Sequence, residues 1–341
     1  MSNVPAVDQR AAPAVVIGID GGGTHTRALC CDLAGRVLAY AQTGGSHPYH
    51  NADASTNVQT AIREVITQAG RTMEDVVALA AGIAGVNIPD DHAWAETFTT
   101  LPGLLCPRLH VNDALVAHRG AFLAQPGIIA IAGTGSMIFA ITDSGRQVRN
   151  FDFNHYAPTA ARYLAYDAVY RILAGDTIAT DAGFVEQVMA YWQVPDLAAL
   201  REHAASNAKR EERQVNRAYG GMAVLVTAAA CEGVSLACAV CDTAVREFSI
   251  GIRLVGMMFA SDTVALTLIG SAARSHYMRE RLTHMLAEQV GKHYRLDEPV
   301  LAPVAGAVLL ALEQHGIALD EPLLRTLAAH PHAAFQAEEV A

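Results

Sequence analysis

Two short glycine-rich segments contain residue types that could hold phosphate groups. One follows the apolar run Val15–Ile19 and the other follows the apolar run 128–132. Glycine has no Cβ, so successive backbone N–H groups in such turns can approach a phosphate closely, and Thr and Ser hydroxyls add donors. The candidate nucleotide-binding residues here are Asp20, Gly21, Gly22, Gly23, Thr24 and Thr26 in the first turn, and Gly133, Thr134, Gly135 and Ser136 in the second. Two ordinary hairpin turns are the alternative.

A carboxylate opens the first of these turns. Asp20 stands at the end of the predicted strand, where it would reach Mg²⁺ through water, because Mg²⁺ keeps most of its hydration shell in proteins. Only Lys209 and Lys292 are lysines, and neither lies in a G-x-x-x-x-G-K-[ST] segment, which excludes a P-loop. A nucleotide would therefore be bound by backbone amides and a metal ion.

The elements that must position these turns alternate between strand and helix patterns. Residues 14–20 predict a buried strand, followed by two strands of an antiparallel meander around the turn 33–35. A helix with Ser55 or Thr56 as N-cap should end at Gly70. Further strands are predicted in 76–86, 108–113, 127–148 (two strands around a glycine turn) and 263–271, and helices at 114–124, 275–290 and 303–316. A predominantly helical stretch follows residue 156, with helices predicted at 156–174, 180–191, 196–206 and 217–259, the last broken near Gly233.

This order of elements predicts an α/β protein in two lobes. We expect a lobe at 1–113, a second lobe at 114–316 that carries a helical insertion, and a C-terminal helix with a loose tail at 317–341. Each lobe has a glycine turn directly after a buried strand, an arrangement typical of a duplicated fold.

Composition narrows the class of protein. A formal net charge of −10 and the lack of a basic block argue against nucleic-acid binding. The sequence has no signal-peptide pattern at its start and no apolar run near the ~20 residues of a membrane helix, so we expect a cytoplasmic protein that does not bind membranes. Cys238 and Cys241 form a C-x-x-C that favours core packing over a metal site, and Cys30 and Cys31 should point to opposite faces of a strand.

Four segments in order carry a resemblance to a known family. "GIDGGGTHTRA", "VNDALVAHRGA", "PGIIAIAGTGS" and "LIGSAARS" resemble the phosphate-1, catalytic, phosphate-2 and adenosine motifs of the actin/hexokinase/Hsp70 ATPase superfamily. Within it, the chain is similar to the branch of N-acetylglucosamine kinases and BadF/BadG/BcrA/BcrD ATPases. The resemblance implies a two-lobed, actin-like (ribonuclease-H-like) fold that binds ATP and Mg²⁺, and a homodimer.

The resemblance also assigns roles. It implies that Asp113 is the general base, which takes the proton from a sugar hydroxyl as that oxygen attacks the γ-phosphoryl group; a helix N-cap is the alternative role for Asp113. Gly270 and Ser271 match the adenosine turn. The candidate substrate-binding residues are Ser46, His47, Asn51 and Asn112.

Two departures from the family pattern affect the acceptor. His47 stands where these kinases carry an Asn. "YAPTA", Tyr156 to Ala160, stands where they carry Gly-Asp-Glu-Gly-Ser, so the acidic pair of the sugar site is absent. The sequence predicts an ATP-dependent kinase, a phosphotransferase for an amino sugar or N-acetylamino sugar. The alternatives are a kinase for another acceptor such as an aminocyclitol, and a non-catalytic ATP-dependent switch.

Overall fold

The computed structural model describes residues 14–336. The expectation of no signal peptide falls partly on residues 1–13, and the end of the expected loose tail falls on 337–341; both lie outside the described residues. The chain forms two compact units: 14–123 together with 300–336, and 124–299. The division differs from the expected one, because residues 114–123 and 300–316 pack in the first unit rather than the second.

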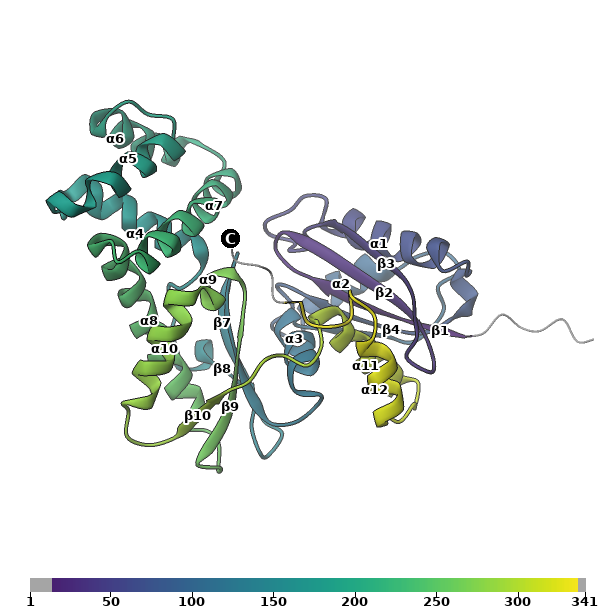
Figure 1. Ribbon diagram of the computed structural model, residues 1–341. Helices are drawn as coiled ribbons and strands as arrows, with labels where there is room; N and C mark the ends of the chain where they lie inside the picture. The colour runs from purple at the N-terminus through teal and green to yellow at the C-terminus, as the bar shows by residue number, and fades with distance from the viewer. Residues whose placement is uncertain (1–13, 337–341) are drawn as a thin grey trace, which may run out of the picture. The chain divides into compact units, whose positions relative to one another are not determined.

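The first unit is a five-stranded sheet with helices on both faces (Figure 1). Its strand order is β3-β2-β1-β4-β5, with β1 antiparallel to β2 and parallel to β4. The strands are β1 (Val15–Gly21), β2 (His25–Asp32), β3 (Val37–Gly44), β4 (Val76–Ile83) and β5 (Arg108–Val111). The helices are α1 (Ala54–Gln68), η1 (Met73–Asp75), α2 (Asp91–Thr99), α3 (Asp113–Phe122), α11 (Pro303–Gln314) and α12 (Glu321–Ala328).

The two faces of this sheet have separate apolar cores, because successive side chains of a strand point to opposite sides. Ile17 packs on the side of α1, whereas Val16 packs against α11. Cys30 belongs to the first core and Cys31 to the second, so the prediction that they point to opposite faces is confirmed.

The second unit repeats the strand plan of the first. Its order is β10-β9-β6-β7-β8, again a meander joined to parallel strands, which confirms the predicted duplication. The strands are β6 (Gly127–Ala132), β7 (Ser136–Ile141), β8 (Gln147–Arg149), β9 (Thr263–Ile269) and β10 (His293–Leu296). The helices are η2 (Asn150–Phe153), α4 (Ala161–Ala174), η3 (Ala179–Asp181), α5 (Ala182–Tyr191), α6 (Leu197–Ser206), η4 (Asn207–Lys209), α7 (Glu212–Cys231), α8 (Ser235–Gly256), α9 (Ser271–Arg274) and α10 (His276–Ala287).

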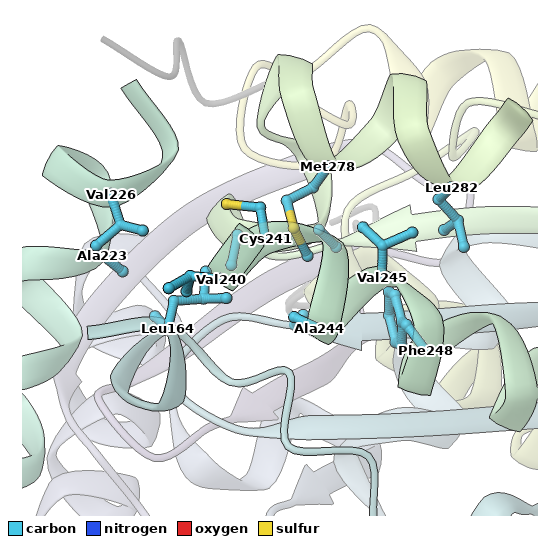
Figure 2. Packing of buried hydrophobic residues seen from close by; sticks show 14 of the residues in the cluster. Leu164, Ala223, Val226, Val240, Cys241, Ala244, Val245, Phe248, Met278 and Leu282 are labelled. Atoms are coloured by element: carbon cyan, nitrogen blue, oxygen red, sulfur yellow. The ribbon is translucent and has the colours of Figure 1, made fainter. Parts of the chain in front are cut away.

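One large apolar cluster joins the helices of this unit (Figure 2). Phe248 and Val245 of α8 pack with Leu282 of α10, and Cys241 lies in the same cluster, as expected for a packing role. Burial raises the pKa of the Cys241 thiol to about 12, so it is a neutral core residue. Among the described helices none is, on its own, long and apolar enough to cross a membrane; the bent pair α7 and α8, 109° apart, meets the length and composition test only jointly.

Three local predictions need correction. Helix α1 begins at Ala54, one residue before the expected caps, and Asp53 precedes it without a side-chain cap bond. Helix α4 begins at 161 rather than 156, because the preceding residues run past the second glycine turn. The expected loose tail is ordered up to residue 336, where Ala333 is fully buried and its carbonyl accepts a hydrogen bond from Ala302 N at 2.8 Å.

Candidate active site

Two aspartates lie at the carboxyl ends of the two parallel strands that flank β4 in the first unit. Asp20 is the penultimate residue of β1, and Asp113 is the first helical residue after β5. Strands β1, β4 and β5 run parallel, so their carboxyl ends meet at one edge of the sheet. Asp20 pairs with Gly82 of β4, which pairs with Val111 of β5, and the negative charge of Asp20 contributes to the raised pKa of Asp113.

Both carboxylates hold a proton more tightly than an exposed aspartate. Burial raises the pKa of Asp20 to about 6, and Arg27 partly offsets this effect; Arg27 Nη1 lies 3.6 Å from Asp20 Oδ2. Burial, and then the charge of Asp20, raises the pKa of Asp113 to about 7. A carboxyl group that titrates near neutral pH is suited to accept a proton and release it again.

The residue before Asp113 supplies the helix cap. Asn112 Oδ1 accepts a hydrogen bond from Ala114 N at 2.9 Å, and its Nδ2 donates to Val86 O at 3.0 Å. The alternative role of Asp113 as the N-cap is therefore wrong. Asn112, predicted as a substrate-binding residue, ties the loop after β4 to the start of α3 and so fixes the backbone that carries Asp113.

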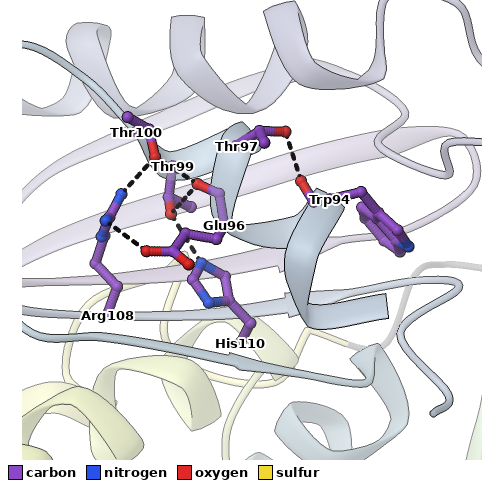
Figure 3. A network of polar contacts seen from close by, with 7 residues as sticks. All are labelled: Trp94, Glu96, Thr97, Thr99, Thr100, Arg108 and His110. Atoms are coloured by element: carbon purple, nitrogen blue, oxygen red, sulfur yellow. Dashed lines mark hydrogen bonds and ion pairs between the residues drawn. The ribbon is translucent and has the colours of Figure 1, made fainter. Parts of the chain in front are cut away.

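A polar network fixes the strand that leads to Asp113 (Figure 3). Arg108 of β5 donates to Thr100 Oγ1 at 2.8 Å and to Glu96 Oε1 at 3.0 Å. His110 Nε2 lies 2.8 Å from Thr99 Oγ1, and burial lowers the pKa of His110 to about 4, so this contact is made by a neutral ring. These bonds attach the end of α2 to β5 two residues before Asn112.

The first glycine turn packs closely against the loop after β3. A Cβ at Gly21 would collide with the Ser46 hydroxyl, and one at Gly45 would collide with the carbonyl of Gly23. Ser46 N donates to Gly22 O at 3.0 Å. None of the glycines in the turn has a left-handed φ, so close approach, and not turn geometry, requires glycine at position 21.

Some donors of the first glycine turn form hydrogen bonds within residues 14–336, whereas the amide of Gly23 does not. Gly22 N donates to His25 O at 2.9 Å, and the buried Thr26 hydroxyl donates to Gly44 O at 2.8 Å. Gly23 N donates no hydrogen bond within the described part of the chain, and Gly23 and Thr24 are exposed. Of the predicted phosphate-binding groups, Gly23 and Thr24 thus lie at the accessible tip, whereas Gly22 N bonds within the β1–β2 turn and Thr26 links β2 to the end of β3.

The other substrate-binding candidates gather in the loop after β3. Asn51 Nδ2 donates to Gly45 O at 2.6 Å, so this side chain serves the loop itself, whereas Ser46 is fully buried and its hydroxyl has no hydrogen-bond partner among the described residues. His47 is only partly buried, and a Cβ at Gly85 would lie 3.6 Å from its Nε2. Burial lowers the pKa of His47 to about 4, so the ring is neutral at physiological pH and can bond a hydroxyl.

The second glycine turn is supported by the segment that departs from the family pattern. Ser136 Oγ donates to Ala157 O at 2.9 Å, and Ala161 N donates to Gly133 O at 2.8 Å. The amide of Gly133 bonds the carbonyl of Gly135 at 2.9 Å within the turn. A Cβ at Gly135 would meet no atom within 4 Å, so this residue, beside Thr134, lies on the open side of the turn.

The predicted adenosine turn lies directly against this phosphate turn. Strands β6 and β9 are parallel neighbours, with Ile131 beside Ile269, so the turns that follow them start at the same edge. Gly270 has a φ of +92°, and a Cβ there would lie 2.5 Å from Ala132 O. A glycine is therefore required at position 270, and the next residue, Ser271, is exposed at the start of α9.

Comparison with known proteins identifies the family of the chain. The model of the BadF/BadG/BcrA/BcrD ATPase family matches residues 17–311. The chain belongs to this ATPase family. The family assignment made from the four motifs is thereby confirmed.

Relatives of this family member carry kinase names. The chain is 31% identical over 144 residues to an N-acetylmuramic acid/N-acetylglucosamine kinase of Clostridium acetobutylicum. The matched region covers 41% of this chain and 46% of that protein. The chain is 31% identical over 121 residues to the glucosamine kinase GspK of Vibrio cholerae, covering 35% of this chain and 41% of that protein. The chain thus matches less than half the length of these two relatives.

A solved structure shows the same fold. A Chromobacterium violaceum protein, provisionally assigned as an N-acetylglucosamine kinase, superposes with a TM-score of 0.68 at 22% identity, covering 88% of this chain and 99% of that one. The predicted α/β fold with two duplicated lobes is confirmed.

Sequence reasoning missed two arginines of the ATPase family member. Arg27 faces Asp20 across the β1–β2 hairpin. Its signal in the sequence was the hairpin register, because pairing the strands on either side of the glycine turn puts Arg27 opposite Asp20. Arg162 Nη1 donates to Thr134 O at 2.8 Å. The sequence feature that could have revealed Arg162 is its place in the first turn of a helix, where the helix dipole disfavours positive charge.

Proposed function

We propose that this chain is an ATP-dependent kinase that transfers the γ-phosphoryl group to a hydroxyl of an amino sugar or N-acetylamino sugar. The observation that carries the proposal is the pair Asp20 and Asp113 at the carboxyl ends of parallel strands, with the pKa of Asp113 raised to about 7. The names of the relatives support the acceptor class. The proposal includes Mg²⁺ as cofactor, a cytoplasmic location and a homodimer.

Asp113 acts as general base in this proposal. Its carboxylate accepts the proton of the acceptor hydroxyl while that oxygen forms a bond to the γ-phosphorus, and the bond from phosphorus to the ADP oxygen breaks. Asn112 holds the carboxylate in place through the helix cap. His47, neutral and beside Gly85, would bond a sugar hydroxyl.

The carboxylates fit a divalent cation. Burial raises the pKa of each, and Arg27 offsets this only in part at Asp20, so a bound cation would favour the charged form of both carboxylates. No group of three or more His, Cys, Asp or Glu side chains in residues 14–336 forms a metal cage, which agrees with Mg²⁺ held by Asp20 largely through water and phosphates. When bound, Mg²⁺ would neutralise phosphate charge.

The test is ADP release from Mg-ATP against a panel of sugars, amino sugars and aminocyclitols, with mass spectrometry of the products. We expect one acceptor class to gain a single phosphate. Asp113→Ala should lower turnover at least ~100-fold with little change in ATP affinity, because general-base catalysis contributes roughly 10²–10⁴-fold.

In the wild-type enzyme, kcat/KM should rise with pH up to about 7, as the Asp113 carboxyl loses its proton.

Asp176→Asn serves as the matched control, since Asp176 is exposed and lies outside the site. A phosphorylated aminocyclitol would support the kinase activity but would change the proposed acceptor class. Slow ATP hydrolysis indifferent to every acceptor would contradict the kinase proposal and favour the ATP-dependent switch.

A further inference from the structure

Arg162 is held rigidly beside the second glycine turn. Its Nη1 donates to Thr134 O at 2.8 Å, and its Nη2 donates to Tyr163 Oη at 3.0 Å. The guanidinium carbon also lies 4.4 Å from the centre of the Tyr163 ring. The position of this cation is therefore set by the turn on one side and by an aromatic residue on the other.

The charge of Arg162 is not neutralised by the protein. Among residues 14–336, no carboxylate lies within ion-pair distance of it. It stands in the first turn of α4, a helix with no acidic residue in that turn and no side-chain cap. A cation at this end of a helix opposes the helix dipole and destabilises the helix. Such an arrangement is favourable once an anion binds.

The neighbouring backbone offers a partner for the same anion. Gly135 N donates no hydrogen bond within the described part of the chain, and the space around Gly135 is open. An oxygen bound at this amide would lie close to Arg162, because Arg162 itself contacts the adjacent residue, Thr134. Neither lysine of this unit could replace Arg162 as the cation at the turn. Lys292 lies 3.8 Å from Asp262, which precedes β9, whereas the turn follows the other end of the sheet, and Lys209 is the last residue of η4.

We propose that Arg162 is a nucleotide-binding residue that contacts the phosphate chain of ATP at the Gly133–Ser136 turn. This inference rests on the proposed kinase function. Arginine suits the role because its planar fork pairs with two phosphate oxygens while other N–H groups keep their protein acceptors. The segment that lacks the family's acidic pair thus leads into a helix whose first turn supplies a cation.

The test compares Arg162→Met, Arg162→Lys and the matched control Arg146→Met by calorimetric titration with ATP and with adenosine. Arg146 is an exposed arginine of the same unit, in the β7–β8 turn. We expect Arg162→Met to weaken ATP binding roughly 10–100-fold, the usual loss for a hydrogen bond to a charged group. Adenosine affinity should not change, Arg162→Lys should recover part of the loss, and Arg146→Met should bind ATP normally.

A second readout separates binding from folding. The salt dependence of ATP affinity should be weaker in Arg162→Met than in the wild type, since one cation is lost, while the thermal midpoint of the free protein stays equal or rises. Unchanged ATP affinity in Arg162→Met overturns the inference. So does a raised KM for the acceptor alone, which would assign Arg162 to the acceptor. A wild-type protein that fails to bind ATP would overturn the proposed function itself.

Discussion

The carboxylate of Asp113 is in an environment that opposes its own ionisation. Burial and the charge of Asp20 raise its pKa from the ordinary value of 3.8 to about 7. A group whose pKa is higher in the folded state contributes stability below the unfolded pKa, and this contribution is lost as pH rises through the folded pKa. At neutral and alkaline pH the ionised Asp113 therefore lowers the free energy of unfolding.

Replacing Asp113 by Asn should stabilise the free protein in a pH-dependent way. Asn keeps an oxygen that can accept the hydrogen bond from Ala114 N, which lies 3.0 Å from Asp113 Oδ1, but carries no charge. The free energy of unfolding should rise by about 1–4 kcal/mol at pH 8, and the gain should disappear between pH 7 and pH 4. Urea titrations without Mg²⁺ or nucleotide measure this, with Asp176→Asn as the control. A gain of equal size at pH 4.5 and pH 8 would contradict the electrostatic explanation.

At the scale of elements, α11 holds the aspartate-bearing strand and helix together. A Cβ at Gly18 would collide with the backbone of α11 at Val308, so β1 and α11 are in direct backbone contact. A Cβ at Gly306 would lie 2.5 Å from Gly120 N of α3, and one at Gly120 would lie 2.7 Å from Ala302 O. Glycines in three elements therefore allow α11 to lie close to both β1 and α3.

Gly306→Ala should consequently destabilise the protein and lower its activity. The added methyl group meets backbone atoms, which cannot rotate away, so we expect a loss of about 1–3 kcal/mol. Because α3 begins with Asp113, its displacement should also reduce turnover at temperatures where the protein stays folded. The matched change Gly220→Ala, in α7 with no atom within 4 Å, should instead gain up to about 1 kcal/mol. Thermal unfolding of the two variants tests this, and equal midpoints would contradict it.

Features that depend on interactions between residues close in sequence could be predicted, whereas features that depend on distant residues could not. The strands around the glycine turns were predictable, because β-branched runs and glycine act locally. The helix break at Gly233, with a φ of +79°, was predicted for the same reason. The cap at Asn112 was missed because adjacent Asn and Asp both favour caps, and the bond from Asn112 Nδ2 to Val86 O, which helps to hold the Asn112 side chain, joins segments 26 residues apart.

At the scale of the whole molecule, the chain returns to its first unit after completing the second. Helix α11 supplies Val304, Val308 and Leu312 to the apolar core on one face of the first sheet. No local pattern could reveal this return, because the apolar composition of α11 shows that the helix is buried but not against which sheet it packs. The sequence therefore placed residues up to 316 in the second lobe, whereas 300–336 pack with 14–123.

A chain ending at residue 299 should lose the fold of the first unit and keep that of the second. Without α11, Val16 and Ala80 of the first sheet would face water, whereas the core around Phe248 is built within 124–299. Hydrogen exchange read by mass spectrometry should show fast exchange in β1 and β4 and retained protection in β6 and α8. A chain ending at 316 keeps α11 and should retain protection in β1, with a smaller loss from the missing Leu323 and Leu327 of α12. Full protection of β1 in the shorter chain would mean that the first sheet does not depend on α11, and that the close contacts at Gly18 and Gly306 are not what holds Asp20 and Asp113 in place.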